Sequence, residues 1–329
     1  MDENGLISSD NGEVSSDNVK EQPRNVYIWD MDETLILLRS LLDGSYAGAF
    51  HGLKDTRKGV EIGKQWENHI LQICDDYFFY EEIENYNEPF LNSLTEYDDG
   101  RDLSIYDFEN DGFTSPFDDS NERKLAYRHR SIAEKYAKGV HDFLDQQTIK
   151  SWNDLYSSTD SYTDGWLSSA HALLEEVVEK NKVPTGNGPV SAGSKSQNIN
   201  VLVTSGSLIP SLAKCLLYRL DDVIPCDNHS MLKMFANLIP VYSSWEVGKL
   251  QCFRWIKARF DGPKVRFCVI GDGLEECEAA RLMNWPFVKV DFRPNGIHRF
   301  PGLDMRTIQS YIDVVYGSPP QVEAESYEG

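Results

Sequence analysis

The chain has 329 residues, and 53 acidic against 32 basic side chains give it a formal net charge of −21. This charge argues against a non-specific nucleic-acid-binding protein, because a phosphate backbone repels an acidic surface. The polar start of the chain has the features of neither a signal peptide nor a membrane anchor, and no apolar run is long enough to span a membrane. The six cysteines form no C-x-x-C pair, which indicates a reduced, intracellular protein of the cytoplasm or nucleus.

Three segments have the composition of disordered chain. Residues 1–23 are rich in Ser, Asn, Asp and Glu and predict a disordered acidic tail. Residues 183–198 are rich in Gly, Pro and Ser, which is typical of a flexible connection, and residues 318–329 predict a second disordered tail.

The first ordered element is the run V-Y-I-W, which starts at Val26. An apolar run with little polar alternation is typical of a strand buried on both faces of a parallel sheet. Helical periodicity follows in three segments, 60–86, 121–147 and 164–182, with no convincing strand between them. Strands are then expected at 199–204, 237–242, 265–270 and 286–290, alternating with helices at 208–220, 245–260, 274–283 and 304–316.

This alternation of strands and helices predicts an α/β fold with a doubly wound parallel sheet. The sheet domain would comprise residues 24–43 and 199–317. Residues 44–198 would form a large helical cap, inserted just after the first strand and placed to roof the acidic loop that follows it.

That acidic loop is Asp30-Met31-Asp32. It stands at the carboxyl end of the first strand, where open α/β sheets keep their ligands. If the strand pattern continues through the pair, both carboxylates point the same way, and a divalent cation such as Mg²⁺ would offset their repulsion. A carboxylate held near such a metal is suited to attack phosphorus, while a second acid exchanges protons. Alternatively, D-x-D only opens a turn or caps a helix.

Later strands end in further candidate residues. In V-L-V-T-S-G-S, Thr204 and Ser205 follow a buried strand and precede a helix, where a hydroxyl and amide groups suit phosphate oxygens. Lys249 could neutralise a nucleophilic aspartate and the phosphoryl group together. Asp272, in V-I-G-D-G-L-E-E, could complete a metal shell, with Glu276 and Glu275 supporting it from outside.

Each of these features also has an ordinary structural interpretation. A Ser or Thr at a helix start is more often an N-cap, a lysine on a helix is usually solvated, and G-D-G is common in turns. One further segment imitates the spacing of a calcium-binding loop, with Asp107, Asp111 and Gly112 at its first, fifth and sixth positions. Its twelfth position is Asp118 instead of Glu, and Pro116 lies inside it, both of which disfavour a calcium site.

The order of D-x-D, Thr/Ser, Lys and Gly-Asp, each after a predicted strand, resembles the haloacid dehalogenase superfamily of phosphohydrolases. Longer segments are similar to the C-terminal domain of the Eyes absent family. These segments are W-D-M-D-E-T-L-I-L-L, G-S-Y-A, D-L-S-I-Y-D-F-E-N-D-G-F, R-K-L-A-Y-R-H-R, V-L-V-T and I-G-D-G-L-E-E. The similarity covers about residues 24–317.

The resemblance implies a role for each matched position. Asp30 would be the nucleophile and a metal ligand, and Asp32 would bind the metal through its carbonyl and act as the acid and base. Ser205, beside Thr204, would hold the phosphate, together with Lys249. Asp272 would be the third metal ligand, with Glu276 nearby. The family implies an Mg²⁺-dependent protein tyrosine phosphatase, acting through an aspartyl-phosphate on a phosphotyrosine protein or peptide.

Two other functions remain open at this point. The chain could be an interaction module or transcriptional cofactor, in which the helical cap binds a regulatory protein and catalysis is incidental or absent. It could also be a small-molecule phosphatase of the same superfamily. Neither nucleic acid nor a membrane is expected as a direct partner.

Overall fold

A computed structural model describes residues 23–179, 198–224, 239–262 and 264–317. The predicted tails and the predicted connection over 183–198 lie outside these residues, apart from residues 23 and 198. Among the helices of the described ranges, none is both long and apolar enough to cross a membrane.

The centre of the described fold is a five-stranded sheet in the order β3-β2-β1-β4-β5, in which every neighbouring pair is parallel. The strands are β1 (Arg24–Trp29), β2 (Ile199–Thr204), β3 (Val241–Ser243), β4 (Val265–Gly271) and β5 (Phe287–Lys289). The chain leaves β1 in one direction to build β2 and β3, and returns to the other side of β1 for β4 and β5. This arrangement confirms the doubly wound α/β fold that the sequence predicts.

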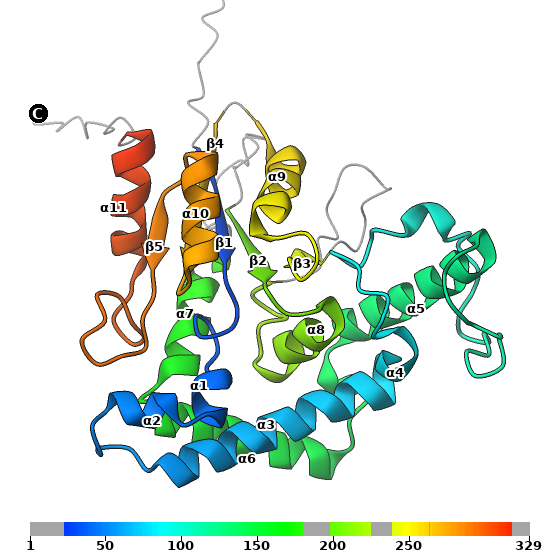
Figure 1. Ribbon diagram of the computed structural model, residues 1–329, viewed down its shortest axis with the longest axis horizontal. Coiled ribbons are helices and arrows are strands. Elements are labelled where there is room, and N and C mark those ends of the chain that lie inside the picture. The colour runs from blue at the N-terminus through cyan, green and yellow to red at the C-terminus, as the bar shows by residue number, and fades with distance from the viewer. Residues whose placement is uncertain (1–22, 180–197, 225–238, 263, 318–329) are drawn as a thin grey trace, which may run out of the picture.

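Helices cover both faces of the sheet (Figure 1). Alternate side chains of β1 divide between them, since Val26 and Ile28 lie in one apolar cluster and Tyr27 and Trp29 in the other. The first cluster includes α9 (Lys249–Phe260) and α10 (Leu274–Met283). The second includes α7 (Trp166–Glu179), α8 (Leu208–Leu217) and α11 (Met305–Tyr316). A strand buried on both faces needs apolar residues at every position, which is why V-Y-I-W lacks polar alternation.

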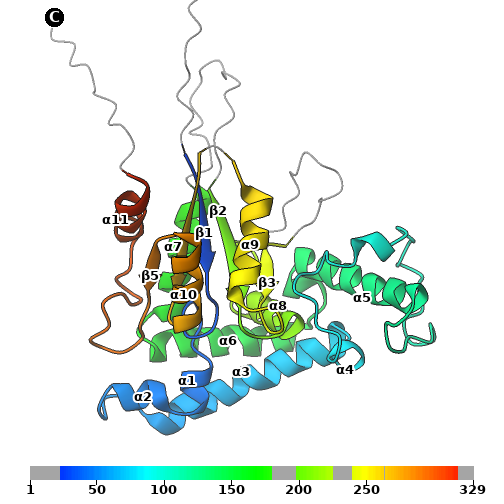
Figure 2. The same ribbon diagram turned by 45° about the horizontal axis from the view of Figure 1, so that its top comes forward.

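The segment between β1 and β2 is mostly helical. Its helices before α7 are α1 (Arg39–Leu42), α2 (Ser45–Ala49), α3 (Thr56–Tyr77), α4 (Tyr80–Ile83), α5 (Asp119–Lys138) and α6 (Gln146–Tyr162), with short 3-10 turns at Thr95–Tyr97 and Val140–Asp142. Figure 2 shows α3 and α6 running across the edge of the sheet at which the strands end. Trp66 of α3 connects these layers: its indole N–H donates to Thr159 of α6 at 2.8 Å, and its ring stacks on Tyr218, just after α8.

Several boundaries differ from the sequence-based expectation. Helix α5 ends at Lys138 instead of continuing to 147, and α9 begins at Lys249 instead of 245. Helix α6 fills most of the gap between the predicted helices 121–147 and 164–182, and α3 ends at Tyr77 instead of continuing to 86. Helix α7 lies in the predicted cap range but packs on the sheet, where the Leu174 carbonyl accepts a hydrogen bond from Asn200 of β2 at 3.0 Å. The division into sheet domain and cap therefore stays a prediction.

Candidate active site

The chain turns sharply after β1. The Asp30 N–H donates to the Ile270 carbonyl of β4 at 2.8 Å and extends the ladder by one residue. The amides of Thr34, Leu35 and Ile36 then all point to the Met31 carbonyl, at 3.4, 2.9 and 3.1 Å. The alternation of the strand is therefore lost at once, and Asp30 and Asp32 need not share a direction.

Asp30 lies in a buried polar cluster, with 6% of its surface exposed. One carboxylate oxygen accepts from the Lys249 ammonium at 2.5 Å, and the other accepts from the Thr34 hydroxyl at 3.1 Å. Lys249 is the first residue of α9 and is itself 3% exposed. Its ammonium also donates to Glu276 of α10 at 2.9 Å, so this single cation joins two buried carboxylates.

Asp272 and Glu276 come from the end of β4 and the first turns of α10. The carboxylate oxygens of Asp30, Asp272 and Glu276 lie within 4.8 Å of one another. Glu276 folds back over the loop and accepts a hydrogen bond from the Gly273 N–H. A Cβ at Gly271 would stand only 2.7 Å from the Glu276 side chain, so the first glycine of G-D-G makes room for this contact. Three converging carboxylates are a donor set suited to a hard divalent cation.

Asp32 lies apart from this group. Its carboxylate accepts from Lys214 of α8 at 2.7 Å, and α8 packs in the apolar cluster on the opposite side of the sheet from α9. The two carboxylates therefore do not point the same way in this structure, so the shared direction expected from a continued strand pattern is not found. The physical reason is that the strand pattern ends at Trp29, and each carboxylate has its own lysine.

The two hydroxyl candidates after β2 differ in exposure. Thr204 is fully buried, and its hydroxyl accepts from the Gly206 N–H at 3.1 Å, which is the local turn contact that a threonine offers without any ligand. Ser205 is exposed at the edge where the strand ends. Of the two, Ser205 is the residue accessible to a phosphate.

Burial and charge act against each other at the centre of the cluster. Burial raises the pKa of the Asp30 carboxyl to about 7, with Lys249 opposing the rise and Glu276 adding to it. Burial alone would lower the pKa of Lys249, but the carboxylates of Asp30 and Glu276 outweigh it and raise that pKa. Burial and the nearby Glu276 also raise the pKa of Asp272. Lys249 thus stays charged, and the carboxylates around it favour an added cation.

Known proteins share this sequence over most of its length. Protein phosphatase EYA of Arabidopsis thaliana is 56% identical over 298 residues, which cover 90% of this chain and 92% of the relative. The chain belongs to the Eyes absent (EYA) family of protein phosphatases. Human protein phosphatase EYA2 is 33% identical over 281 residues, covering 80% of this chain but 47% of the human protein. Drosophila melanogaster protein phosphatase eya is 32% identical over 302 residues, covering 86% of this chain and 36% of the fly protein. These relatives confirm the resemblance seen in the sequence and support a phosphatase.

Comparisons of other kinds add little to this assignment. No protein-family model matches the chain. A crystal structure of a haloacid dehalogenase-like family hydrolase from Xanthomonas campestris covers 89% of this chain and 98% of its own, at 13% identity and a TM-score of 0.35. The EYA family assignment rests on the sequence relatives alone.

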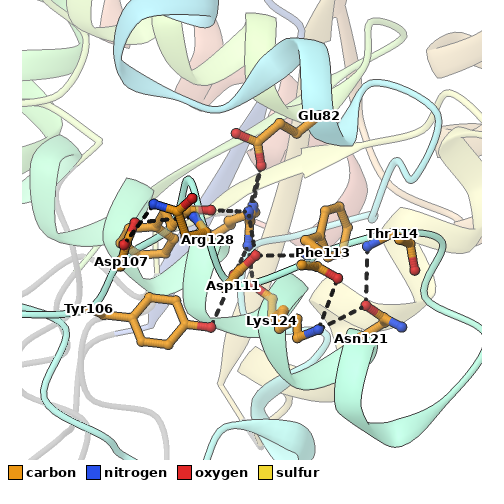
Figure 3. A network of polar contacts seen from close by, with 12 residues as sticks. Glu82, Tyr106, Asp107, Asp111, Phe113, Thr114, Asn121, Lys124 and Arg128 are labelled. Carbon is orange, nitrogen blue, oxygen red and sulfur yellow. Dashed lines mark hydrogen bonds and ion pairs between the residues drawn. The ribbon is translucent and has the colours of Figure 1, made fainter.

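The calcium-like loop of this EYA family member surrounds a protein cation (Figure 3). The Arg128 guanidinium, 1% exposed, donates to Asp111 at 2.7 Å and forms an ion pair with Glu82 at 2.6 Å. It also lies 4.4 Å from the centre of the Phe113 ring. Asp118 is the N-cap of α5, bonded to the Asn121 amide. Among the described residues, the carboxylates that converge closely enough to hold a metal are those at Asp30, not those of this loop.

Sequence reasoning missed two residues of the site. Thr34 bridges Asp30 and Asp272, since its hydroxyl lies 3.1 Å from one carboxylate and 3.5 Å from the other. Its position four residues after Asp30 was a usable signal, because a tight turn brings such residues together. Lys214 carried no local signal, since its contact with Asp32 spans 182 residues of sequence. Glu275, expected outside the metal shell, accepts from the Lys249 backbone N–H at 2.9 Å and so fixes the start of α9.

The cysteines make no contact with the carboxylate cluster among the described hydrogen bonds. Cys74, Cys215, Cys252 and Cys268 are buried and form no disulfide, and Cys277 is partly buried. Burial raises the pKa of the Cys74 and Cys252 thiols to about 12. Cys226 lies outside the described residues. A thiol with so high a pKa is a poor nucleophile at neutral pH, because the thiolate is the reactive form.

Proposed function

We propose that this chain is an Mg²⁺-dependent protein tyrosine phosphatase in which Asp30 is the nucleophile. The observation that carries the proposal is the buried Asp30 carboxylate, held by Lys249 and Thr34 beside Asp272 and Glu276. Membership of the EYA protein phosphatases gives the reaction class. The geometry supports the same class, because it places a fixed oxygen nucleophile next to a fixed positive charge at the ligand-binding edge of the sheet.

The residues present fit the metal. Asp30 and Asp272 would supply carboxylate oxygens, and Asp32 would add its backbone carbonyl, as the family resemblance implies. Glu276 already accepts hydrogen bonds from Lys249 and Gly273, which suits it to an outer position that orients the site. Mg²⁺, when bound, would neutralise charge on the carboxylates and on the phosphoryl oxygens.

The residues of the chain divide the reaction between them. An Asp30 oxygen attacks phosphorus, the bond from phosphorus to the tyrosine oxygen breaks, and an aspartyl-phosphate forms. Lys249 and Ser205 hold the phosphoryl oxygens, and Asp32 gives a proton to the departing oxygen. Asp32 then takes a proton from water, which attacks the aspartyl-phosphate and releases phosphate. Lys214 fixes the Asp32 carboxylate through a 2.7 Å contact on the side of α8.

An aryl phosphate fits this division of roles. A phenol has a pKa near 10, far below that of an alcohol, so a departing phenolate depends less on a proton from Asp32 than an alkoxide does. A site whose acid is partly exposed and bonded to a lysine is therefore better suited to tyrosyl than to seryl phosphates.

The experiment that tests this function is phosphate release from a phosphotyrosyl peptide, with and without Mg²⁺, by the wild type and by Asp30→Asn. We expect release that needs the metal and is lost in the variant, with the fold unchanged by circular dichroism. Release from small metabolite phosphates but not from the peptide would favour a small-molecule phosphatase. A folded wild type that releases phosphate from no substrate would contradict the catalytic proposal.

A regulatory protein bound through the inserted helices stays a prediction. It would be tested by comparing the capture of one defined partner by the wild type and by Asp30→Asn. Equal capture would separate binding from catalysis.

A further inference from the structure

One exposed aromatic side chain stands at the rim of the candidate site. Trp245 exposes 66% of its surface, whereas Trp29, Trp66, Trp152, Trp166 and Trp285 are buried and Trp255 is partly buried. It lies four residues before Lys249, in the turn that joins β3 to α9 (Figure 1). Burying a tryptophan removes a large apolar surface from water, so an exposed one beside a site needs a physical account.

The turn that carries Trp245 is firmly anchored. The Ser244 N–H and hydroxyl both donate to the Thr204 carbonyl, at 2.8 and 3.0 Å, and the Gly248 N–H closes the turn on the Ser244 carbonyl at 2.8 Å. Ser243 donates to the Gly206 carbonyl at 2.8 Å, which ties the turn to the loop that carries Ser205. The backbone that carries the exposed Trp245 side chain is therefore fixed between the Ser205 loop and Lys249.

Two more exposed apolar side chains flank the same region. Val247, two residues before Lys249, is 39% exposed, and Leu274, two residues after Asp272, is 72% exposed. The two loops that carry Val247 and Leu274 are in contact, since the Lys249 N–H donates to the Glu275 carboxylate at 2.9 Å. Exposed apolar side chains therefore stand here beside the exposed carboxylates of Glu246 and Glu275. Hydrophobic residues gathered next to buried charged groups are typical of a substrate-binding surface.

We propose that Trp245, with Val247 and Leu274 beside it, binds the aromatic ring of the substrate and so determines specificity for aryl phosphates. This inference rests on the proposed function, since it places the phosphate on Ser205 and Lys249. The ring of a phosphotyrosine is attached directly to the ester oxygen, so it lies next to the phosphate and outside the buried cluster. A seryl or acyl phosphate presents no ring there. An aromatic pair in offset or edge-to-face contact would then hold the tyrosyl substrate.

The test compares aryl and non-aryl substrates in matched variants. Trp245→Ala should lower the ratio of kcat/KM for phenyl phosphate to that for acetyl phosphate by about 3- to 10-fold, mainly through KM, which is the range expected for one aromatic contact. Trp245→Phe should restore most of the ratio, because it keeps a ring. Leu282→Ala, at the far end of α10 and 58% exposed in the wild type, is the control and should leave the ratio at the wild-type value.

Binding without turnover separates this inference from the proposed function. In an Asp30→Asn background, a phosphotyrosyl peptide should change the tryptophan fluorescence, and the added Trp245→Ala substitution should remove that change. The inference is overturned if Trp245→Ala leaves the ratio unchanged, or lowers both kcat/KM values equally. Loss of all phosphatase activity from the wild type would contradict the proposed function, and the fluorescence titration would then still decide the role of Trp245 in binding.

Discussion

Replacing Lys249 by methionine should reveal how the site keeps its nucleophile ionised. The lysine contacts Asp30 at 2.5 Å and Glu276 at 2.9 Å, and it is the strongest influence that lowers the pKa of Asp30. Burial already raises that pKa to about 7. Without the lysine, the pKa rises further, so a larger share of Asp30 is protonated and inactive at neutral pH. The acid limb of the activity profile should therefore move to higher pH.

The size of the effect follows from the two ion pairs that the substitution removes. Removing one fixed electrostatic partner of a reacting group costs about 10²- to 10³-fold in kcat, or roughly 3 to 4 kcal/mol. The two buried carboxylates left without a cation should also lower the free energy of unfolding by about 3 to 5 kcal/mol. Circular dichroism and urea unfolding must therefore accompany the kinetics, to show that the variant is folded during the assay.

The assay is phosphate release against pH from about 5.5 to 9 at a fixed, sub-saturating Mg²⁺ concentration, because protonation of Asp30 competes with metal binding. Lys257→Met, an exposed position on the same helix, is the matched control and should behave as the wild type. Adding Glu276→Gln to Lys249→Met removes one of the repelling carboxylates and should move the acid limb part of the way back. A folded Lys249→Met protein with kcat within tenfold of the wild type and an unshifted acid limb would refute this reasoning.

Three further predictions concern the metal, the inserted loop and a buried histidine. Chelation of Mg²⁺ should abolish phosphate release but lower Tm by no more than about 5 °C, because Lys249 already offsets the carboxylates; a larger drop in a calorimetric scan would contradict this. Arg128→Met should lower the free energy of unfolding, measured in urea, by about 3 kcal/mol. Asp111 then loses its cation but keeps its hydrogen bonds from the Tyr106 hydroxyl and the Phe113 N–H. A decrease of less than about 1 kcal/mol would count against this prediction. Burial lowers the pKa of His129 to about 4. The free energy of unfolding should therefore fall by up to about 3 kcal/mol as pH drops from 6.5 to 4. In His129→Gln, the free energy of unfolding should depend less on pH over this range.

The sequence predicted the sheet and the edge at which the site lies because these depend on local patterns. V-Y-I-W, V-L-V and F-C-V-I are apolar at successive positions, as strands buried on both faces must be, and a polar residue follows each within two positions. Parallel strands bring those stopping points to one edge. Asp30, Lys249, Asp272 and Glu276 were therefore expected near one another, and the structure places them in one cluster.

The direction of Asp32 could not be read in the same way. It depends on the turn at residues 31–36, where Glu33 adopts a positive φ of 61°, and on a lysine far away in sequence. Helix α6 escaped prediction because its sequence is rich in Ser, Thr and Asp, which have low helix propensity, while its buried face is recognisable only against α3. In both cases the outcome depends on contacts between residues far apart in sequence, which form only in the folded chain.

The burial of the cysteines bears on how this phosphatase responds to oxidants. Peroxide attacks thiolates, and an enzyme that depends on a low-pKa catalytic thiolate is inactivated by it. Here the proposed nucleophile is a carboxylate, which peroxide does not oxidise, and the buried Cys74 and Cys252 thiols remain protonated with pKa values near 12. Under the proposed mechanism, oxidative stress would inactivate thiolate-dependent phosphatases while this chain continued to act, so the two chemistries would respond differently to the redox state of the cell.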